Sequence, residues 1–296
     1  MAEKINIQFT LFSAFYSPLI SMMSGGFLKV EGLEADWSVS PPGVSAIAAL
    51  QDGSAHVAQS ALSQSFTPLE KGEKPPVVHF AQINEMDGFF ITAREPDPKF
   101  EWKKLEGAEM VLFGGGQPNA MFRYACHKAG IDYAKIRTIT PGGAADIDKA
   151  FREGKGRYVQ QQGPFPKLLE KDGVGHVVAQ VGPKIGPCAF SSLAATRDWL
   201  KTDMAKAFMR AYRKCRVYMN ETPAAEIARA EKPYFPKIDE DVLAKCIDVY
   251  QKLGTWTPHV EITKPAYEVT VDVFLHAGLI TRRHAYGDVV AQPPKG

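Results

Sequence analysis

Paired cysteines and metal-binding histidine motifs are missing from this sequence. It has four cysteines, and no two of them form a Cys-x-x-Cys pair, which argues against a zinc ribbon or a thioredoxin-type redox site. The seven histidines show neither His-x-His nor His-Glu-x-x-His spacing, so we expect no metal and no cofactor. Cys126, Cys215 and Cys246 lie in helical patterns beside alanine and aromatic residues, where buried free thiols are expected.

Long apolar runs and clusters of one charge are also missing. No apolar run reaches the ~18 residues that a membrane-spanning helix needs. The net charge is +2 and there is no basic run, so nucleic-acid binding is not expected. The first residues, MAEKINIQFTLF, enter a strand pattern without the features of a signal peptide. We therefore expect a cytoplasmic protein if Met1 is the native start, and a periplasmic protein if a leader has been removed.

What the sequence does contain is an alternation of short strand-like and helical segments. Residues 44–53 form a helix pattern that ends at Gly53, residues 56–60 form a strand, and a second helix starts near Ala61. The strand–helix order returns at residues 113–129 and 152–169. In open α/β sheets ligands bind where strands end and helices begin, because free backbone N–H groups point there. The pattern predicts two α/β lobes that face each other across a ligand cleft.

The lobe borders follow from a change in composition. Residues 95–107 (EPDPKFEWKKLEG) are polar and interrupted by proline, which is typical of a hinge. The last third of the chain is mostly helical and must pack back on the first lobe. We therefore expect lobe 1 to comprise residues 1–94 plus 195–296 and lobe 2 to comprise residues 95–194. Two chain crossovers, near Arg94 and Ala194, would join them.

Four segments in combination resemble one protein family. They are ALQDGSAHVA, VVHFAQINEMDGFFITAR, FGGGQPNAMFRYACHKAGID and AADIDKAFREGKGRYVQQQGPF. Over roughly residues 4–280 the chain resembles the SsuA/THI5 (NMT1-like) family of type II solute-binding proteins, which serve ABC importers. The resemblance implies a type II periplasmic-binding-protein fold, a small organic anion as ligand and, if the chain is exported, an ABC permease as partner.

The sequence departs from the family at several positions. An acidic residue that the family usually carries in a turn is His56 here, and an acidic-Pro turn is replaced by Gln162, Gly163 and Pro164. The position aligned with the active-site histidine of the THI5 pyrimidine synthases is Gln64, and there is no Cys-rich run. No cysteine precedes residue 126, so the chemistry of the related aromatic sulfinate desulfinases is not implied either.

Candidate ligand-binding residues lie at the predicted strand ends. A glycine-rich turn before a helix lets the backbone approach a ligand, and the helix N-terminus binds carboxylate, sulfonate or phosphate. The turn matches neither Gly-x-Gly-x-x-Gly nor a P-loop, so a nucleotide is not expected. The lobe 1 candidates are Ser13, Phe15, Tyr16, Gln59, Ser60 and Ala61. The lobe 2 candidates are Gly115, Gly116, Gln117, Asn119, Gln162, Gly163 and Phe165, with Cys188 and Phe190 near the second crossover.

Three functions remain open from the sequence. The first is a solute-binding protein that closes on a small organic anion, either an aromatic acid or a sulfonate. The second is a cytoplasmic enzyme on the same fold, a decarboxylase or lyase of an aromatic acid, with His56 and Cys188 as candidate catalytic groups. The third is a cytoplasmic ligand sensor.

Overall fold

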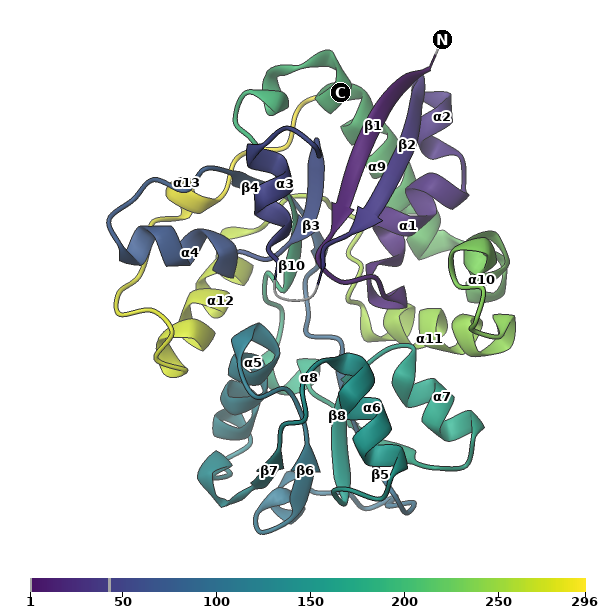
Figure 1. Ribbon diagram of the computed structural model, residues 1–296, viewed down its shortest axis with the longest axis vertical. Coiled ribbons are helices and arrows are strands. Elements are labelled where there is room, and N and C mark those ends of the chain that lie inside the picture. The colour runs from purple at the N-terminus through teal and green to yellow at the C-terminus, as the bar shows by residue number, and fades with distance from the viewer. Residues whose placement is uncertain (1, 42–43) are drawn as a thin grey trace. The chain divides into compact units, whose positions relative to one another are not determined.

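The computed structural model describes residues 2–41 and 44–296 (Figure 1). Contacts among its residues divide the chain into two compact units. Unit 1 comprises Met1–Glu85, Cys188–Val271 and Ile280–Gly296, and unit 2 comprises Met86–Pro187 and Asp272–Leu279. Each unit is built on its own five-stranded mixed sheet.

The sheet of unit 1 has the strand order β2-β1-β3-β10-β4. Strand β1 pairs in parallel with both β2 and β3, so the carboxyl ends of these three strands meet at one edge. Strand β10 runs antiparallel between β3 and β4. The bounds are β1 Glu3–Phe9, β2 Leu33–Val39, β3 Val57–Ser60, β4 Val78–Asn84 and β10 Ser191–Ala195.

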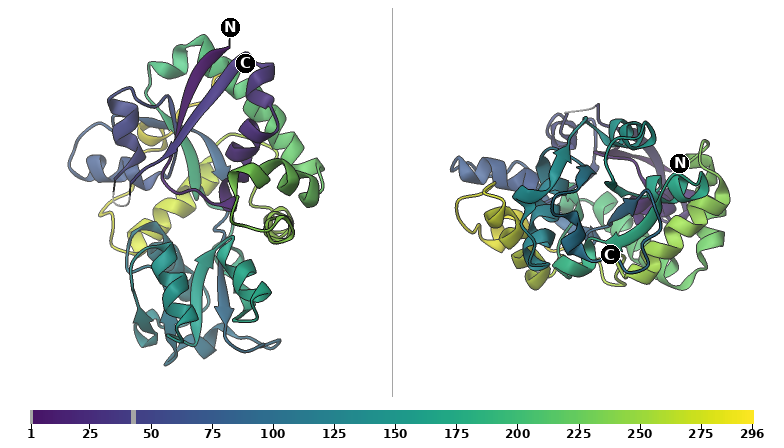
Figure 2. Two further views of the ribbon diagram at one scale, coloured as in Figure 1. Left: turned by 45° about the vertical axis from the view of Figure 1, so that its right-hand side comes forward. Right: turned by 90° about the horizontal axis from the view of Figure 1, so that it is seen from below.

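Helices cover this sheet on both sides. Apolar residues at helical spacing line one side of the long helix α9, whose N-terminus is capped by Thr202, and α9 packs against α1 and α2 (Figures 1 and 2). The helices are α1 Ser17–Ser24, α2 Phe27–Val30, α3 Ala46–Gln51, α4 Ser63–Glu70, α9 Asp203–Glu221, α10 Ala224–Glu231, α11 Glu240–Leu253, α12 Lys264–His276 and α13 Tyr286–Val289. The 3₁₀ turns are η1 Ala14–Tyr16, η4 Trp199–Lys201 and η5 Lys232–Tyr234. The last residues of α12 belong to unit 2.

The sheet of unit 2 has the order β7-β6-β8-β5-β9, with β6, β7 and β8 parallel and β5 antiparallel to both of its neighbours. Its apolar core joins β6 and β8 to helices α6 and α7. The strands are β5 Phe89–Ala93, β6 Glu109–Val111, β7 Arg137–Ile139, β8 Tyr158–Gln162 and β9 His176–Gln180. The helices are α5 Gly116–Lys128, α6 Ala144–Arg152, α7 Phe165–Lys171 and α8 Gly182–Ile185, with 3₁₀ turns η2 Trp102–Leu105 and η3 Tyr133–Lys135.

The borders between the units differ from those expected from the sequence. Strand β5 was expected to end lobe 1, but it pairs with β8 and β9 in the sheet of unit 2. Strand β10 was expected to end lobe 2, but it pairs with β3 and β4 in the sheet of unit 1. The chain leaves unit 1 after Glu85 and returns at Cys188. The polar segment 95–107, which resembled a hinge, is a connection within unit 2. The borders were misplaced because the sequence of an apolar strand does not show which sheet the strand joins.

All four cysteines are buried, and none of them is part of a disulfide bond. In the part of the chain that the structure describes, no helix is both long enough and apolar enough to cross a membrane.

Candidate functional site

In unit 1 the carboxyl ends of β1 and β3 are tied together by Gln59. Its side-chain oxygen accepts hydrogen bonds from the backbone N–H groups of Thr10 and Leu11, both at 3.0 Å. The hydroxyl of Thr10 donates in return to the backbone carbonyl of Gln59 at 2.8 Å. The predicted ligand residue Gln59 therefore uses its amide oxygen to hold the chain where it leaves β1.

The turn that follows carries three predicted ligand residues, Ser13, Phe15 and Tyr16, and it is fixed from two directions. The hydroxyl of Ser13 accepts from the N–H of Phe15 at 3.1 Å and so caps η1. The indole N–H of Trp256 lies 3.1 Å from the carbonyl of Phe15 and 2.8 Å from the side-chain oxygen of Asn84. This contact ties the turn to the end of β4, where the chain leaves the unit.

The predicted ligand residues Phe15, Tyr16 and Phe190 are part of the packed core of unit 1. Phe15 is fully buried and Phe190 is 4% exposed. The Phe15 ring lies 5.3 Å from that of Phe190, 4.9 Å from that of Tyr250 and 5.4 Å from that of Tyr16, measured between centroids. The rings of Phe190 and Tyr250 thus pack against the turn through Phe15, and Tyr16 is buried as well.

Ser60 and Ala61 stand at the end of β3, beside this turn in the sheet. Ser60 is 2% exposed, and its hydroxyl has no hydrogen-bond partner among the described residues. Ala61 is half-buried. A buried hydroxyl without a partner is uncommon in a folded protein, because the lost hydration is not replaced.

In unit 2 the corresponding edge is made of backbone. Gly114, Gly115 and Gly116 connect β6 to α5, and the N-cap residue Gly115 has no side chain to cover the first N–H groups of the helix. Gly116 has a φ of +67°, which favours glycine. A Cβ on Gly114 would lie 3.1 Å from the Cβ of Thr140, so this chain also passes close to the end of β7.

The two neighbouring helix N-termini at this edge differ in charge. Helix α5 has no acidic residue in its first turn, whereas α6 carries Asp146, whose carboxylate accepts from the N–H of Gly143 at 3.0 Å. An anion is therefore favoured at α5 and repelled at α6. Gln117 lies in the first turn of α5. The predicted ligand residue Asn119 instead donates its amide N–H groups to the Phe113 carbonyl and the Tyr133 hydroxyl, both at 2.9 Å.

Strand β8 brings a row of buried glutamines to the same edge. Gln160 and Gln161 each have a side-chain oxygen without a hydrogen-bond partner among the described residues. Gln162 ends the strand and is 4% exposed. Gly163 follows it, and the half-buried Phe165 begins α7.

The two candidate catalytic residues lie at opposite ends of β3. His56 precedes this strand, and its Nδ1 accepts from the backbone N–H of Asn6 at 2.9 Å. Cys188 is fully buried and precedes β10, in which Ser192 pairs with Ser60 at the other end of β3. The four residues of β3 alone span roughly 13 Å, so the structure does not bring His56 and Cys188 together as a reacting pair.

Two buried acids were missed from the sequence. Burial raises the pKa of Asp87 to about 7; one carboxylate oxygen accepts from the N–H of Phe89 at 2.7 Å and the other has no partner in the described chain. Burial also raises the pKa of Glu231 to about 8. A signal existed for Glu231, since it continues the buried stripe of Ile227 and Ala228 on α10. Asp87 offered no comparable pattern.

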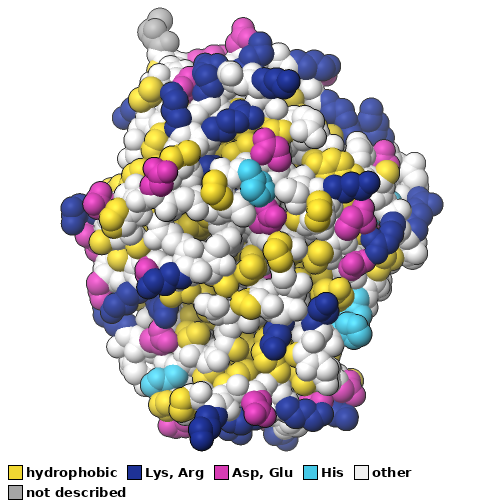
Figure 3. All heavy atoms as spheres, turned by 180° about the vertical axis from the view of Figure 1, so that it is seen from behind, with side chains coloured by type: hydrophobic (Ala, Val, Ile, Leu, Met, Phe, Trp, Pro, Cys, Tyr) yellow, Lys and Arg dark blue, Asp and Glu magenta, His cyan; other side chains and the backbone are white. Residues whose placement is uncertain are grey.

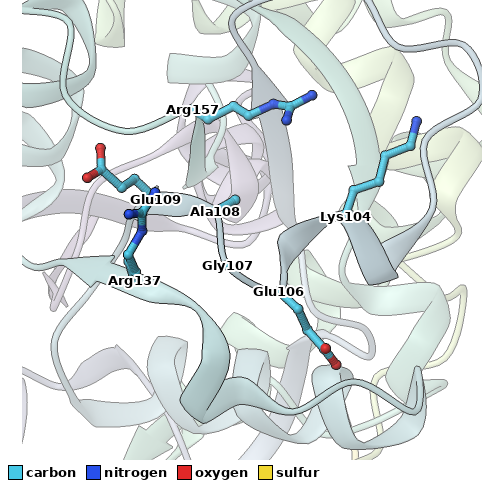
Figure 4. A pocket seen from close by; sticks show the side chains of 7 residues that line it. All are labelled: Lys104, Glu106, Gly107, Ala108, Glu109, Arg137 and Arg157. Carbon is cyan, nitrogen blue, oxygen red and sulfur yellow. The ribbon is translucent and has the colours of Figure 1, made fainter.

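Unit 2 has an open pocket with a volume of about 330 Å³ (Figure 4). The pocket lies away from the sheet edge that carries Gly114, Gly115 and Gly116. Its lining residues precede or begin β6, β7 and β8, and are Lys104, Glu106, Gly107, Ala108, Glu109, Arg137 and Arg157. Figure 4 shows the Glu106 side chain turned away from Arg137 and Arg157, and its carboxylate pairs with Lys103 at 2.8 Å. Charges of both signs are also interspersed over the face in Figure 3. The pocket therefore lies at the amino ends of the strands, whereas the glycine edge, which is the turn of Gly114, Gly115 and Gly116, lies at their carboxyl ends.

Among residues 2–41 and 44–296, no group of three or more histidine, cysteine, aspartate or glutamate residues is placed to hold a metal ion.

Comparison with solved structures identifies the fold. The alkanesulfonate-binding protein SsuA from Xanthomonas axonopodis pv. citri bound to MOPS superposes with a TM-score of 0.75 at 14% identity, covering 98% of both chains. The periplasmic aliphatic sulphonate binding protein SsuA from Escherichia coli gives a TM-score of 0.74 at 16% identity, over 99% of this chain and 93% of that one. The chain thus has the α/β fold of periplasmic binding proteins, as expected.

Sequence comparison identifies the family. A Bacillus subtilis (strain 168) protein described as "Putative binding protein YtlA" is 31% identical over 291 residues, which are 97% of this chain and 87% of that protein. The family model "NMT1/THI5 like" matches residues 16–226. The resemblance seen in the four sequence segments is therefore confirmed, and the chain belongs to the NMT1/THI5-like family.

Proposed function

We propose that this protein is a solute-binding protein that takes a small organic anion, with a sulfonate or carboxylate as its charged group. The observation that carries the proposal is the N-terminus of α5. It is a helix of 13 residues that begins in three glycines, without a capping side chain on Gly115 and without an acidic residue in its first turn. Such a helix start offers backbone N–H groups and the positive end of the helix dipole to an anion.

Neutral polar groups are proposed to bind the rest of the ligand. On unit 2 these are Gln117, Gln162 and the backbone at Gly163, and on unit 1 they are Ser13, Ser60 and the N–H of Ala61. The unpartnered hydroxyl of Ser60 supports this role, because a ligand acceptor would restore its missing hydrogen bond. The burial of Phe15 and Phe190 favours a small ligand body over a large aromatic one.

Relatives support the same class of function. The fold is shared with an alkanesulfonate-binding protein, an aliphatic sulphonate binding protein and a nitrate-binding protein. An ABC permease is the partner that this function implies, provided that the protein is exported. Contacts from both units would favour a closed state, so that binding shifts an open–closed equilibrium.

The proposal is tested by thermal unfolding against a panel of alkanesulfonates, aminosulfonates, aliphatic carboxylates and aromatic carboxylates, followed by calorimetric titration of each compound that raises the melting temperature. Ligand carried through purification is first identified by native mass spectrometry and then removed by unfolding and refolding. We expect one sulfonate or carboxylate to bind at one site per chain. Turnover of the bound compound, detected as CO₂ or a desulfonated product, would contradict the proposal and favour an enzyme.

A further inference from the structure

The Glu231 side chain sits in the interior of unit 1 between α10 and α1. Its residue is fully buried, and both carboxyl oxygens face serine hydroxyls of α1. Oε2 lies 2.8 Å from the hydroxyl of Ser17, and Oε1 lies 2.6 Å from that of Ser21. Burying a carboxylate among hydroxyls without a cation costs free energy, which a proton on the carboxyl group avoids.

The contacts of the Ser17 hydroxyl, which has a single hydrogen atom, indicate that the proton is on the Glu231 carboxyl group. The Ser17 hydroxyl lies 2.8 Å from the carbonyl oxygen of Ala14, which can only accept, and 2.8 Å from Oε2 of Glu231. One hydroxyl hydrogen cannot fully serve two acceptors. If Glu231 is protonated, its O–H donates to Ser17, and Ser17 donates to Ala14. Every group in the chain of contacts then has a partner.

Ala14 begins η1, the turn that also holds Phe15 and Tyr16 and is capped by Ser13. We infer that Glu231 is a positioning residue for this turn: as a protonated acid it passes a hydrogen bond through Ser17 to Ala14, and its ionisation releases the turn and weakens ligand binding. The inference rests on the proposed function only in assuming that the turn contacts the ligand.

Among residues 2–41 and 44–296, no cation pairs with the Glu231 carboxylate and would hold it ionised. Burial is the largest cause of its raised pKa of about 8, and the two serine hydrogen bonds oppose the rise. Arg216 is occupied by the carbonyls of Ile83 and Thr257. Helix α1 has no titratable side chain, and on α10 Arg229 pairs with Glu240 of α11 at 3.7 Å. The titratable groups that interact with Glu231 are Cys215 and Tyr218 of α9 and Tyr234 of η5. Further out, Arg216 acts on Cys215 and Glu226 acts on Tyr218.

The first experiment follows the turn without any ligand. The sequence has four tryptophans, so an amide-correlation NMR spectrum shows four indole N–H signals, and the Trp256→Phe variant identifies the one that contacts Phe15. We expect this signal to titrate near pH 8 in the wild type and to stay constant in Glu231→Gln, since the amide keeps a donor for Ser17 and cannot ionise. A wild-type signal that is constant from pH 6 to 9, or one that titrates equally in Glu231→Gln, would overturn the inference.

The second experiment measures ligand affinity over the same pH range. At pH 9, about one unit above the pKa, roughly one molecule in ten keeps the proton, so the dissociation constant should rise about tenfold. Glu231→Gln should show no such rise. Ser17→Ala should bind more weakly than the matched variant Ser21→Ala, because only Ser17 also contacts Ala14. Equal affinities of the two serine variants would contradict the relay. Titration of the indole signal in a protein that binds none of the anions would instead support the positioning role and refute the proposed function.

Discussion

The two units share one strand arrangement, but the edges that we propose to bind the ligand are fixed by different means. In each sheet four strands run in the same direction, and the fifth, β10 in unit 1 and β5 in unit 2, runs antiparallel to both of its neighbours. Each of these antiparallel strands follows soon after the chain passes from one unit to the other. In unit 1 the edge is held by side chains, through Gln59, Trp256 and Ser17. In unit 2 it is held by glycine backbone before α5. Unit 1 therefore orients its edge through buried polar contacts, whereas unit 2 presents exposed glycines before α5.

The largest expected effect is on the side-chain network of unit 1. Trp256→Ala removes a ring that is 1% exposed and two hydrogen bonds to the turn and to Asn84. We expect the free energy of unfolding to fall by about 3–5 kcal/mol. Chemical denaturation measures it, with Trp102→Ala of unit 2 as the control, because Trp102 is half-buried. A loss no larger than in the control would show that the turn is held by other contacts.

In unit 2 the backbone at Gly182 passes close to the residues that precede β5. A Cβ on Gly182 would lie 2.3 Å from the carbonyl oxygen of Asp87 and 2.6 Å from the side chain of Met86. Gly182→Ala should therefore lower the free energy of unfolding by about 1–3 kcal/mol. Gly115→Ala is the control, since nothing lies within 4 Å of its Cβ position. Equal stabilities of the two variants in denaturant titrations would refute this packing argument.

The loss of unfolding free energy at acidic pH should depend on a buried histidine of unit 1. His79 is fully buried between Ser192 and Ser65, at 2.8 and 3.2 Å, and burial lowers its pKa from 6.5 to about 3. Between these values the unfolded chain binds a proton that the folded chain does not, so stability falls as the pH is lowered from about 6.5 to about 3. His79 contributes a slope of about 1.4 kcal/mol per pH unit.

His79→Gln should remove that slope, measured as the free energy of unfolding at a series of pH values. An unchanged slope in the variant would assign the acid sensitivity to other groups.

Glu231 changes the stability in the opposite direction. Its folded pKa of about 8 exceeds the unfolded value near 4.5, so stability is lost as the pH rises through this interval.

The smallest expected change in stability is in the glycine edge of unit 2. Gly116 and Gly130 lie at the two ends of α5 with φ values of +67° and +70°. Alanine at either position should cost about 1 kcal/mol of stability. Only Gly116→Ala should also weaken anion binding, because only its backbone lies at the start of the helix. Equal affinities in calorimetric titrations of the two variants would remove the α5 N-terminus from the ligand site.

The strands and helices could be predicted from the sequence because local patterns specify them. The strand pattern at residues 56–60 corresponds to β3, and the strand–helix pattern at residues 113–129 contains α5. The sheet that β5 joins could not be predicted, since pairing of Phe89 with Gln162 is a long-range contact. The burial of Phe15 likewise depends on Tyr250 and Trp256, more than 230 residues later. The glycine turn before α5 was recognised because its chemistry is local. The stripe on α10 could have indicated that Glu231 is buried, but the α1 serines that contact its carboxyl group are more than 200 residues away in the sequence.

The most direct test of the account is a calorimetric titration of the best anion into the wild type and into Ser60→Ala, Gly116→Ala and Gly130→Ala. We expect one site per chain, with weaker binding in Ser60→Ala of unit 1 and in Gly116→Ala of unit 2, and unchanged binding in Gly130→Ala. Affinity that depends on one unit alone, or a panel in which no anion binds, would contradict it.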